Sequence, residues 1–316
     1  MSHTLRIHYH RDFDGMVSAA VLAKILTETH DEKVVWSSVN YDQRRDWKAF
    51  GGSERFAIVD FHFHPNAEYW FDHHPTTFLT PELRKAYEPT DRWAWDEASP
   101  SCPPLILRHA AEHWGYDAPE RFVDMAKWSD VVDAARFRDV EQAIFGDEPA
   151  LRITRSMTAA PSRDYPDELV AAMFKMSLEE VACLPVVEKA HERAARNRDK
   201  ALEQFPRTVV SISDQVLHYD ASSSKVRRER FAPFYHHPEL KYAVGVIPTR
   251  SGFHVTAGQN PFSPPTQGLH LGELMEKHGG GGHRAVAGAN PDSLEDARVL
   301  AAECAELLRA AVHPKS

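Results

Sequence analysis

The N-terminal part of the chain alternates short apolar segments with amphipathic ones. Residues 5–10 are apolar and β-prone, and they run into a turn-forming acidic cluster. Apolar residues then recur every four positions, from Val17 to Ile25, which predicts a helix over residues 16–29. Further apolar segments predict strands at residues 34–36, 56–60 and 68–71. The fold class we expect is therefore α/β, with a mostly parallel sheet whose ligands lie beyond the carboxyl ends of the strands.

The rest of the chain is first helical and then mixed. Helical periodicity covers residues 105–114, 120–135 and 178–205, the last of which is interrupted at a proline. Strand-like segments follow at residues 208–212, 242–247 and 253–257, and we expect the last two to pair with each other. A terminal helix is predicted over residues 294–312. We expect a catalytic domain over residues 1–185, a helical connector over 186–206 and a smaller α/β domain over 207–316.

Composition restricts the class of partner. Among 316 residues, 37 basic and 46 acidic side chains give a net charge of −9, which argues against binding to long duplex DNA. No apolar run approaches the roughly 20 residues that span a bilayer, and no signal peptide is evident. The three cysteines are sparse and unpaired in sequence, which is typical of a reducing compartment. We therefore expect a cytoplasmic protein without a membrane partner, and the oligomeric state, a homodimer included, stays open.

The unusual feature is the set of 19 histidines, several of which accompany carboxylates. His8, Asp12 and Asp14 are spaced so that their side chains can converge on one or two divalent ions, and hard oxygen ligands with imidazole suit manganese or magnesium. Asp12 or Asp14 could instead cap the following helix. Asp60 ends a predicted strand, where its two oxygens could bridge two metals or cap a loop.

Two further acidic motifs follow. In Asp72-His73-His74, one histidine can bind metal while the other reaches the substrate, and Asp72 can orient a histidine. Asp130 and Asp133 share one helix face, and the spacing alone does not decide which of them completes a metal site. Two more histidines, at positions 62 and 64, are expected to lie outside the site.

A glycine run precedes the terminal helix. Consecutive glycines allow backbone N–H groups to approach an anion closely, and neighbouring cationic side chains could add charge at a phosphate. A flexible loop is the alternative interpretation. The residues concerned are Gly280, Gly281, Gly282, His283 and Arg284.

Taken together, these motifs resemble the DHH phosphoesterases with a C-terminal DHHA1 domain. The matching blocks occur in the family's order over nearly the whole chain. They are His8-x-x-x-Asp12-x-Asp14-Gly15, Val59-Asp60, Asp72-His73-His74, an aspartate within residues 128–137, and Gly280-Gly281-Gly282-His283.

The resemblance implies a hydrolase with two divalent ions, Mn²⁺ being expected and Mg²⁺ or Co²⁺ being alternatives. It implies one ion at His8, Asp12 and Asp60, and the other at Asp14, Asp60, His73 and Asp133. Asp133 is chosen because an aromatic residue follows it four positions later, as in the family, and Asp130 remains a competitor. His74 would face the scissile phosphate, and Asp72 is the other predicted catalytic residue. In the second domain, the glycine loop, His283, Arg284 and Arg250 would bind the substrate.

The expected function is hydrolysis of phosphoester bonds in short oligonucleotides, linear dinucleotides or nucleoside 3′,5′-bisphosphates. Such substrates need few phosphate contacts, which agrees with the acidic chain. One alternative is the same chemistry on inorganic polyphosphate. An aromatic surface on which a nucleotide base could stack would argue against this alternative, and the candidates for it are Phe231, Phe253 and Phe262. Another is a non-catalytic nucleotide-binding regulatory protein.

Overall fold

The computed structural model describes residues 4–40, 47–225, 228–249, 252–264 and 269–312. The chain divides into two compact units. The first comprises residues 1–136 and 147–194, and the second comprises 137–146 and 195–316. Helix α9 (Pro185–Gln204), which covers most of the segment predicted as a connector, contributes residues to both units.

The first unit contains a five-stranded parallel sheet, which confirms the predicted α/β class. The strand order is β2-β1-β3-β4-β5, and every neighbouring pair is parallel. The strands are β1 (Leu5–His10), β2 (Val34–Val39), β3 (Phe56–Val59), β4 (Tyr69–Asp72) and β5 (Trp93–Trp95). Because β1, β3 and β4 are adjacent and parallel, the acidic segments that follow them meet at one edge of the sheet.

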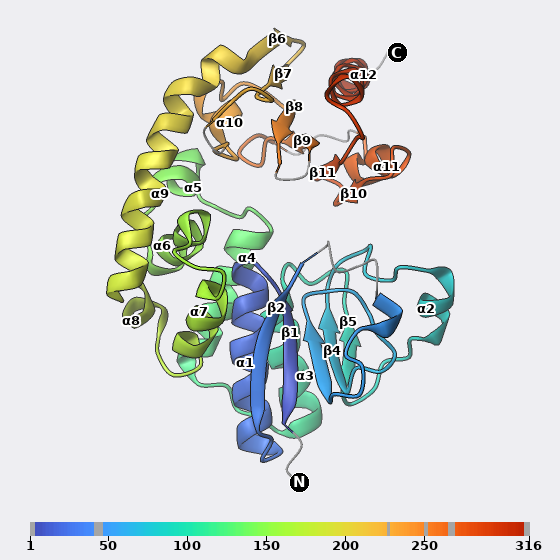
Figure 1. Cartoon of the computed structure of the whole chain (residues 1–316), viewed down its shortest axis with the longest axis vertical. Coiled ribbons are helices and arrows are strands. Elements are labelled where there is room, and N and C mark those ends of the chain that lie inside the picture. Colours follow the sequence, from blue (N-terminus) through green and yellow to red (C-terminus); the bar gives the residue numbers. More distant parts are fainter. Residues whose placement is uncertain (1–3, 41–46, 226–227, 250–251, 265–268, 313–316) are drawn as a thin grey trace. The chain divides into compact units, whose positions relative to one another are not determined.

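The two faces of this sheet are covered differently. Leu5, Ile7 and Tyr9 of β1 are buried against the helical layer of α1, α3, α4 and α7. Alternate strand residues such as Phe56 and Trp70 belong instead to an aromatic core on the other face. Figure 1 shows α1 alongside β1 and β2.

Helices α1, α3 and α4 confirm the predicted helical segments of this unit. Helix α1 begins at Phe13, earlier than predicted, because Asp12 caps it. Four further helices, counted among the described residues, had not been predicted or are shorter than the predicted segment. The bounds are α1 (Phe13–Thr29), α2 (Pro81–Ala86), α3 (Cys102–Trp114), α4 (Glu120–Asp133), α6 (Pro149–Ser156), α7 (Tyr165–Met173) and α8 (Leu178–Ala182), with a 3₁₀ turn at Met157–Ala159.

The second unit contains a six-stranded mixed sheet of order β10-β11-β9-β8-β7-β6, in which only β7 and β8 pair in parallel. The predicted antiparallel pair is β8 with β9. Two residues of the glycine run form β10 rather than a loop, and β7 and β11 had not been predicted. The strands are β6 (Val209–Ser213), β7 (Val216–Asp220), β8 (Tyr242–Pro248), β9 (Phe253–Gln259), β10 (Gly281–Gly282) and β11 (Val286–Ala289).

Helix α12 packs on this sheet and buries a row of small and apolar residues against β7, β8 and β9. The helices of the unit are α5 (Val140–Phe145), α10 (Ala232–His236), α11 (Leu271–Glu276) and α12 (Leu294–Val312), with a 3₁₀ turn at Phe205–Thr208. Within the described part of the chain, no helix combines the length and the apolar character that crossing a membrane requires.

Candidate metal centre

The turn between β1 and α1 supplies the first group of polar side chains. Asp12 is the N-cap of α1, where its Oδ1 accepts a hydrogen bond from Gly15 N at 2.9 Å, and its Oδ2 lies 2.7 Å from Nδ1 of His10. A Cβ atom at position 15 would lie 2.1 Å from the carbonyl oxygen of His10, so this tight turn requires glycine. Both interpretations of Asp12, helix cap and candidate ligand, are therefore compatible with its geometry.

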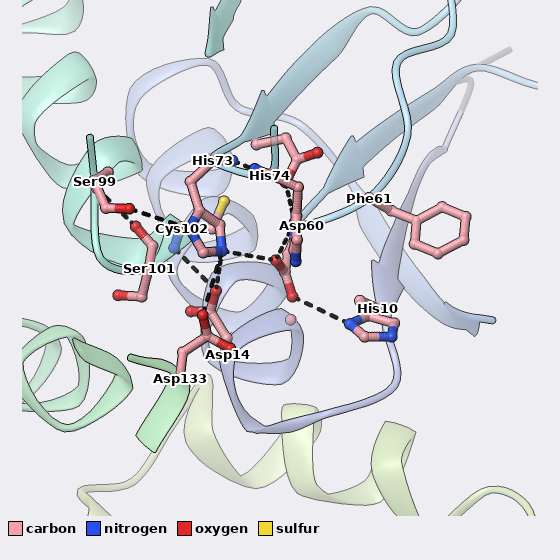
Figure 2. Close-up of polar contacts among 12 residues, drawn as sticks. His10, Asp14, Asp60, Phe61, His73, His74, Ser99, Ser101, Cys102 and Asp133 are labelled. Atoms are coloured by element: carbon pink, nitrogen blue, oxygen red, sulfur yellow. Dashed lines mark hydrogen bonds and ion pairs between the residues drawn. The ribbon is translucent and has the colours of Figure 1, made fainter. Parts of the chain in front are cut away.

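Asp60 follows β3 and lies at the centre of the cluster. It is 1% exposed, and its φ of 55° places it in the left-handed region, which aspartate tolerates better than most residues. Its Oδ2 lies 3.6 Å from His10, whereas its Oδ1 lies 3.5 Å from His73 and 3.6 Å from His74. Figure 2 shows the carboxylate between His10 on one side and His73 and His74 on the other.

The segment after β4 is held by a hydrogen-bond network around Asp72. Its Oδ1 accepts hydrogen bonds from Nδ1 of His74 and from the backbone N of His73, both at 2.8 Å. Its Oδ2 accepts a hydrogen bond from the buried hydroxyl of Thr77. The carboxylate of Asp72 therefore fixes the orientation of the His74 ring. Thr77 had not been predicted, because a threonine two residues after Pro75 has no signature beyond that of a turn.

His73 is aimed into the cluster by the backbone. Its Nδ1 donates to the carbonyl oxygen of Ser99 at 3.1 Å, which directs Nε2 toward three carboxylates (Figure 2). That Nε2 lies 3.5 Å from Asp14, 3.5 Å from Asp60 and 3.6 Å from Asp133.

The structure separates the two aspartates of α4. Asp133 reaches the cluster with Asp14 and His73, whereas Asp130 accepts a hydrogen bond from the Ser101 hydroxyl at 2.6 Å. Asp14 is fixed in turn by the first amide of α3, because Cys102 N donates to its Oδ2 at 2.9 Å. Asp130 thus holds the start of α3, and Asp133 faces Asp14 and His73.

His8 does not reach this cluster, and His10 takes the place predicted for it. Strand β1 extends through His10, so His8 lies about 7 Å back along the strand, on the same face. Its ring packs edge-on against Phe50 at 4.6 Å and Phe56 at 6.0 Å between ring centroids, and burial lowers the pKa of His8 to about 4. The sequence signal that could have identified His10 is the period of two along a strand.

His62 and His64 also lie in aromatic surroundings. The Nδ1 of His62 donates to the carbonyl oxygen of Thr77 at 3.2 Å, and Nδ1 of His64 accepts a hydrogen bond from Asn66 N at 3.1 Å. Both rings are buried near Trp47.

Electrostatics in the cluster reflects the crowding of carboxylates. Burial raises the pKa of Asp14 well above its usual range, helped by Asp60 and Asp133, and burial raises the pKa of Asp133 to about 6. Burial would lower the pKa of His73 and His74, but the adjacent carboxylates outweigh it and raise both to about 10.

Asp60 shows the opposite shift. Burial alone would raise its pKa, but the imidazoles of His10, His73 and His74 hold it well below its usual range. Burial alone would lower the pKa of His10, but the carboxylate of Asp12 and, after it, that of Asp60 raise it. Protons on histidines thus supply positive charge that divalent cations can replace.

The donor set fits binding of divalent metal ions. Among the described residues, Oδ1 of Asp14 and both carboxylate oxygens of Asp60 are buried without a hydrogen-bond donor. Buried carboxylate oxygens are costly unless a cation or a donor compensates them. Three overlapping groups of side chains have ligand atoms close enough to share an ion: His10, Asp12 and Asp60; Asp14, His73 and Asp133; and Asp60, Asp72, His73 and His74.

In the second unit, the predicted phosphate-binding segment is a tight backbone structure. Gly280 and Gly282 pass close to β11. A Cβ atom at position 280 would lie 2.2 Å from Gly288 O, and one at position 282 would lie 2.5 Å from Val286 O. His283 follows β10 and is half-buried, and Arg284 is exposed. Arg250 lies outside the described residues. Of the aromatic candidates, Phe231 is buried, and Phe253 and Phe262 are half-buried.

Comparison with known proteins supports the fold. No family model matches the sequence, and no curated protein matches it. Among solved structures, the chain is similar to the pGpG-specific phosphodiesterase PggH from Vibrio cholerae, with a TM-score of 0.68 and 20% identity over 98% of this chain and 99% of that one.

Two further structures extend the comparison. RecJ from Thermus thermophilus, solved with Mn²⁺, matches with a TM-score of 0.53 and 15% identity, covering 100% of this chain and 53% of RecJ. An exopolyphosphatase-related protein from Bacteroides fragilis matches with a TM-score of 0.50 and 10% identity over 98% and 94% of the two chains. The chain therefore has the fold of the DHH/DHHA1 phosphoesterases, as its motifs predict.

Proposed function

We propose that this protein is a divalent-metal-dependent phosphodiesterase that hydrolyses short oligonucleotides, linear dinucleotides or nucleoside 3′,5′-bisphosphates. The observation that carries the proposal is the position of Asp60, a buried carboxylate whose two oxygens face two different sets of ligand-type side chains. This arrangement supports a pair of ions sharing one bridging ligand.

The side chains divide between two ion sites. His10, Asp12 and Asp60 would hold one ion, and Asp14, Asp60, His73 and Asp133 would hold the other. When bound, two such ions supply an activated water and neutralise charge on a phosphoryl group, and Mn²⁺ is the ion that we propose. No protein nucleophile is required by this chemistry.

His74 would act on the substrate rather than on an ion. Asp72 accepts the proton at Nδ1, so Nε2 is the atom that His74 can present to a phosphate oxygen. Despite burial, the Asp72 carboxylate beside Nδ1 raises the pKa of His74, which favours the protonated imidazole. The proton on Nε2 would stabilise negative charge on the phosphoryl oxygens or on the departing oxygen. Asp72 would contribute by orienting this imidazole.

The second unit would hold the rest of the substrate. The amides of Gly280 and His283 donate to Met275 O and Val286 O, so we propose that the substrate is bound mainly by side chains, those of His283 and Arg284 beside the closely packed glycines at positions 280–282 and that of Arg250. A short substrate agrees with the net charge of −9, since a long strand needs an extended cationic groove. PggH, which shares the fold, is specific for pGpG, itself a linear dinucleotide.

The test is turnover by the purified protein with Mn²⁺ on a panel of pGpG, pApA, a 5-mer RNA, pAp, cyclic dinucleotides, polyphosphate and pyrophosphate. We expect hydrolysis of one or more of the linear nucleotides, and none by an Asp60→Asn variant prepared in parallel, which excludes a contaminating nuclease. Turnover of polyphosphate alone would assign the protein to inorganic substrates. Absence of turnover with two ions bound would refute the proposed activity.

A further inference from the structure

Arg84, on helix α2, lies in a cage of aromatic rings. Its guanidinium carbon is 4.7 Å from the ring centroid of Trp95, 5.0 Å from that of Phe78 and 5.9 Å from that of Tyr87. The side chain is nevertheless exposed. Among the described residues, no carboxylate or carbonyl group accepts a hydrogen bond from the guanidinium.

The cage is attached to the candidate active site. Trp95 ends β5, directly beside Asp72 in the strand register, and its indole Nε1 donates a hydrogen bond to the carbonyl oxygen of His74 at 3.0 Å. Phe78 follows His74 by four residues and packs edge-on against Trp95, with 5.4 Å between ring centroids. Two of the three rings that hold the guanidinium are therefore joined to the histidine proposed to act on the phosphate, Phe78 along the chain and Trp95 through its hydrogen bond.

Other arginines of this unit have structural roles that Arg84 lacks. Arg55 is satisfied by Glu32 and Glu68 at 2.7 and 2.8 Å, and Arg108 pairs with Asp96 at 2.6 Å. An exposed cation–π contact contributes little to stability by itself. The rings hold the planar guanidinium in one orientation and leave its N–H edge available to a ligand. That edge matches the geometry of a phosphate group.

We infer that Arg84 binds a phosphate of the substrate other than the one that is cleaved, such as the terminal phosphate of a linear dinucleotide. The inference rests on the proposed function, because it assumes that the scissile phosphate lies at the Asp60 centre. It adds a contact from the first unit to those proposed for the second. Specificity for a terminally phosphorylated nucleotide would then depend on a residue outside all the motifs identified in the sequence.

The experiment compares pGpG with GpG, which lacks only the terminal phosphate. Dissociation constants are measured by titration calorimetry with Mn²⁺ present in Asp60→Asn protein, and kcat/KM is measured in the active enzyme. We expect Arg84→Gln to weaken binding of pGpG at least tenfold and to lower its kcat/KM at least tenfold, mainly through KM. The values for GpG should stay within twofold, and Arg84→Lys should retain part of the preference.

Arg92→Gln is the matched control. Arg92 is also exposed and lies over a single ring, that of Tyr69, just before the amino end of β5, so its loss should leave both substrates unaffected. Equal losses for pGpG and GpG in Arg84→Gln, or the same loss in Arg92→Gln, would overturn the inference, as would an absence of preference in the wild-type protein. If no nucleotide is hydrolysed but binding of pGpG still depends on Arg84, the proposed activity fails and the anion site stands.

Discussion

Substitution of Asp60 by asparagine is the most direct test of the bridging arrangement. The variant removes one negative charge and one ligand oxygen but preserves the shape of the side chain. Asparagine also tolerates the left-handed backbone, here at φ 55°, so the turn after β3 should keep its conformation. Asp31 has a similar φ of 52° but is exposed after α1, so Asp31→Asn is a control for the backbone effect.

The magnitude follows from the contacts of Asp60. Three imidazoles lie 3.5–3.6 Å from its oxygens, and at an effective dielectric constant near 20 each unit-charge pair at that distance interacts by about 5 kcal/mol. Divalent ions in their place would interact more strongly with the same carboxylate. Loss of only about 4 kcal/mol of transition-state stabilisation corresponds to roughly a thousandfold lower rate.

The assay is Mn²⁺-dependent hydrolysis of bis(p-nitrophenyl) phosphate, with bound metal counted by elemental analysis. We expect Asp60→Asn to bind fewer than two ions and to lose at least about a thousandfold in kcat/KM, whereas Asp31→Asn stays near wild type. Two ions bound by Asp60→Asn together with more than a tenth of the wild-type rate would refute the bridging role.

Three other predictions address the same centre. His10→Ala should weaken Mn²⁺ binding at least tenfold in calorimetric titrations, because His10 lies beside Asp60. His8→Phe should leave Mn²⁺ binding unchanged, because the His8 ring lies among aromatic rings. If His8→Phe weakened binding and His10→Ala did not, His8 would be the ligand, as the motif spacing predicts. Because the pKa of Asp133 is raised to about 6, the proton-bound form is favoured in the folded state, and its contribution to stability is lost as pH rises through 6. The rise in melting temperature on adding Mn²⁺ should therefore be larger at pH 8 than at pH 5, and an equal or smaller rise would contradict the assignment. Thr77→Val should lower kcat about tenfold with little change in metal content, and Thr77→Ser should restore it, because the hydroxyl fixes Asp72 behind His74; a loss of bound metal instead would place Thr77 with the ligands.

Much of the centre could be predicted because strand ends converge in a parallel sheet. Asp60 and the Asp72-His73-His74 segment are separated from the first motif in sequence, yet β1, β3 and β4 are neighbours, and their carboxyl ends coincide. Periodicity alone could not separate Asp130 from Asp133, since both lie on one helix face, and the family resemblance favoured the residue that the structure brings to the cluster.

The predictions that the structure does not bear out have local causes. His8 and His10 share a face of β1, and only the true end of the strand decides which of them lies at the sheet edge. Strand β5 has three residues between charged segments, too few for an alternating pattern to be recognised, so Trp95 and its cage could not be predicted. Strand β7 was missed because the preceding turn, at Asp214 and Gln215, lacks glycine although both residues have positive φ.

The amide of Cys102 that holds Asp14 lies 88 residues further along the chain, and Asp133 lies later still. During synthesis on the ribosome, the acidic turn after β1 therefore emerges long before the groups that complete it. A nascent chain that ends before α4 contains His10, Asp12 and Asp60 but lacks the aspartate that joins Asp14 and His73. If two ions bind as proposed, uptake of the second would thus report that α4 has joined the strands that carry the other ligands.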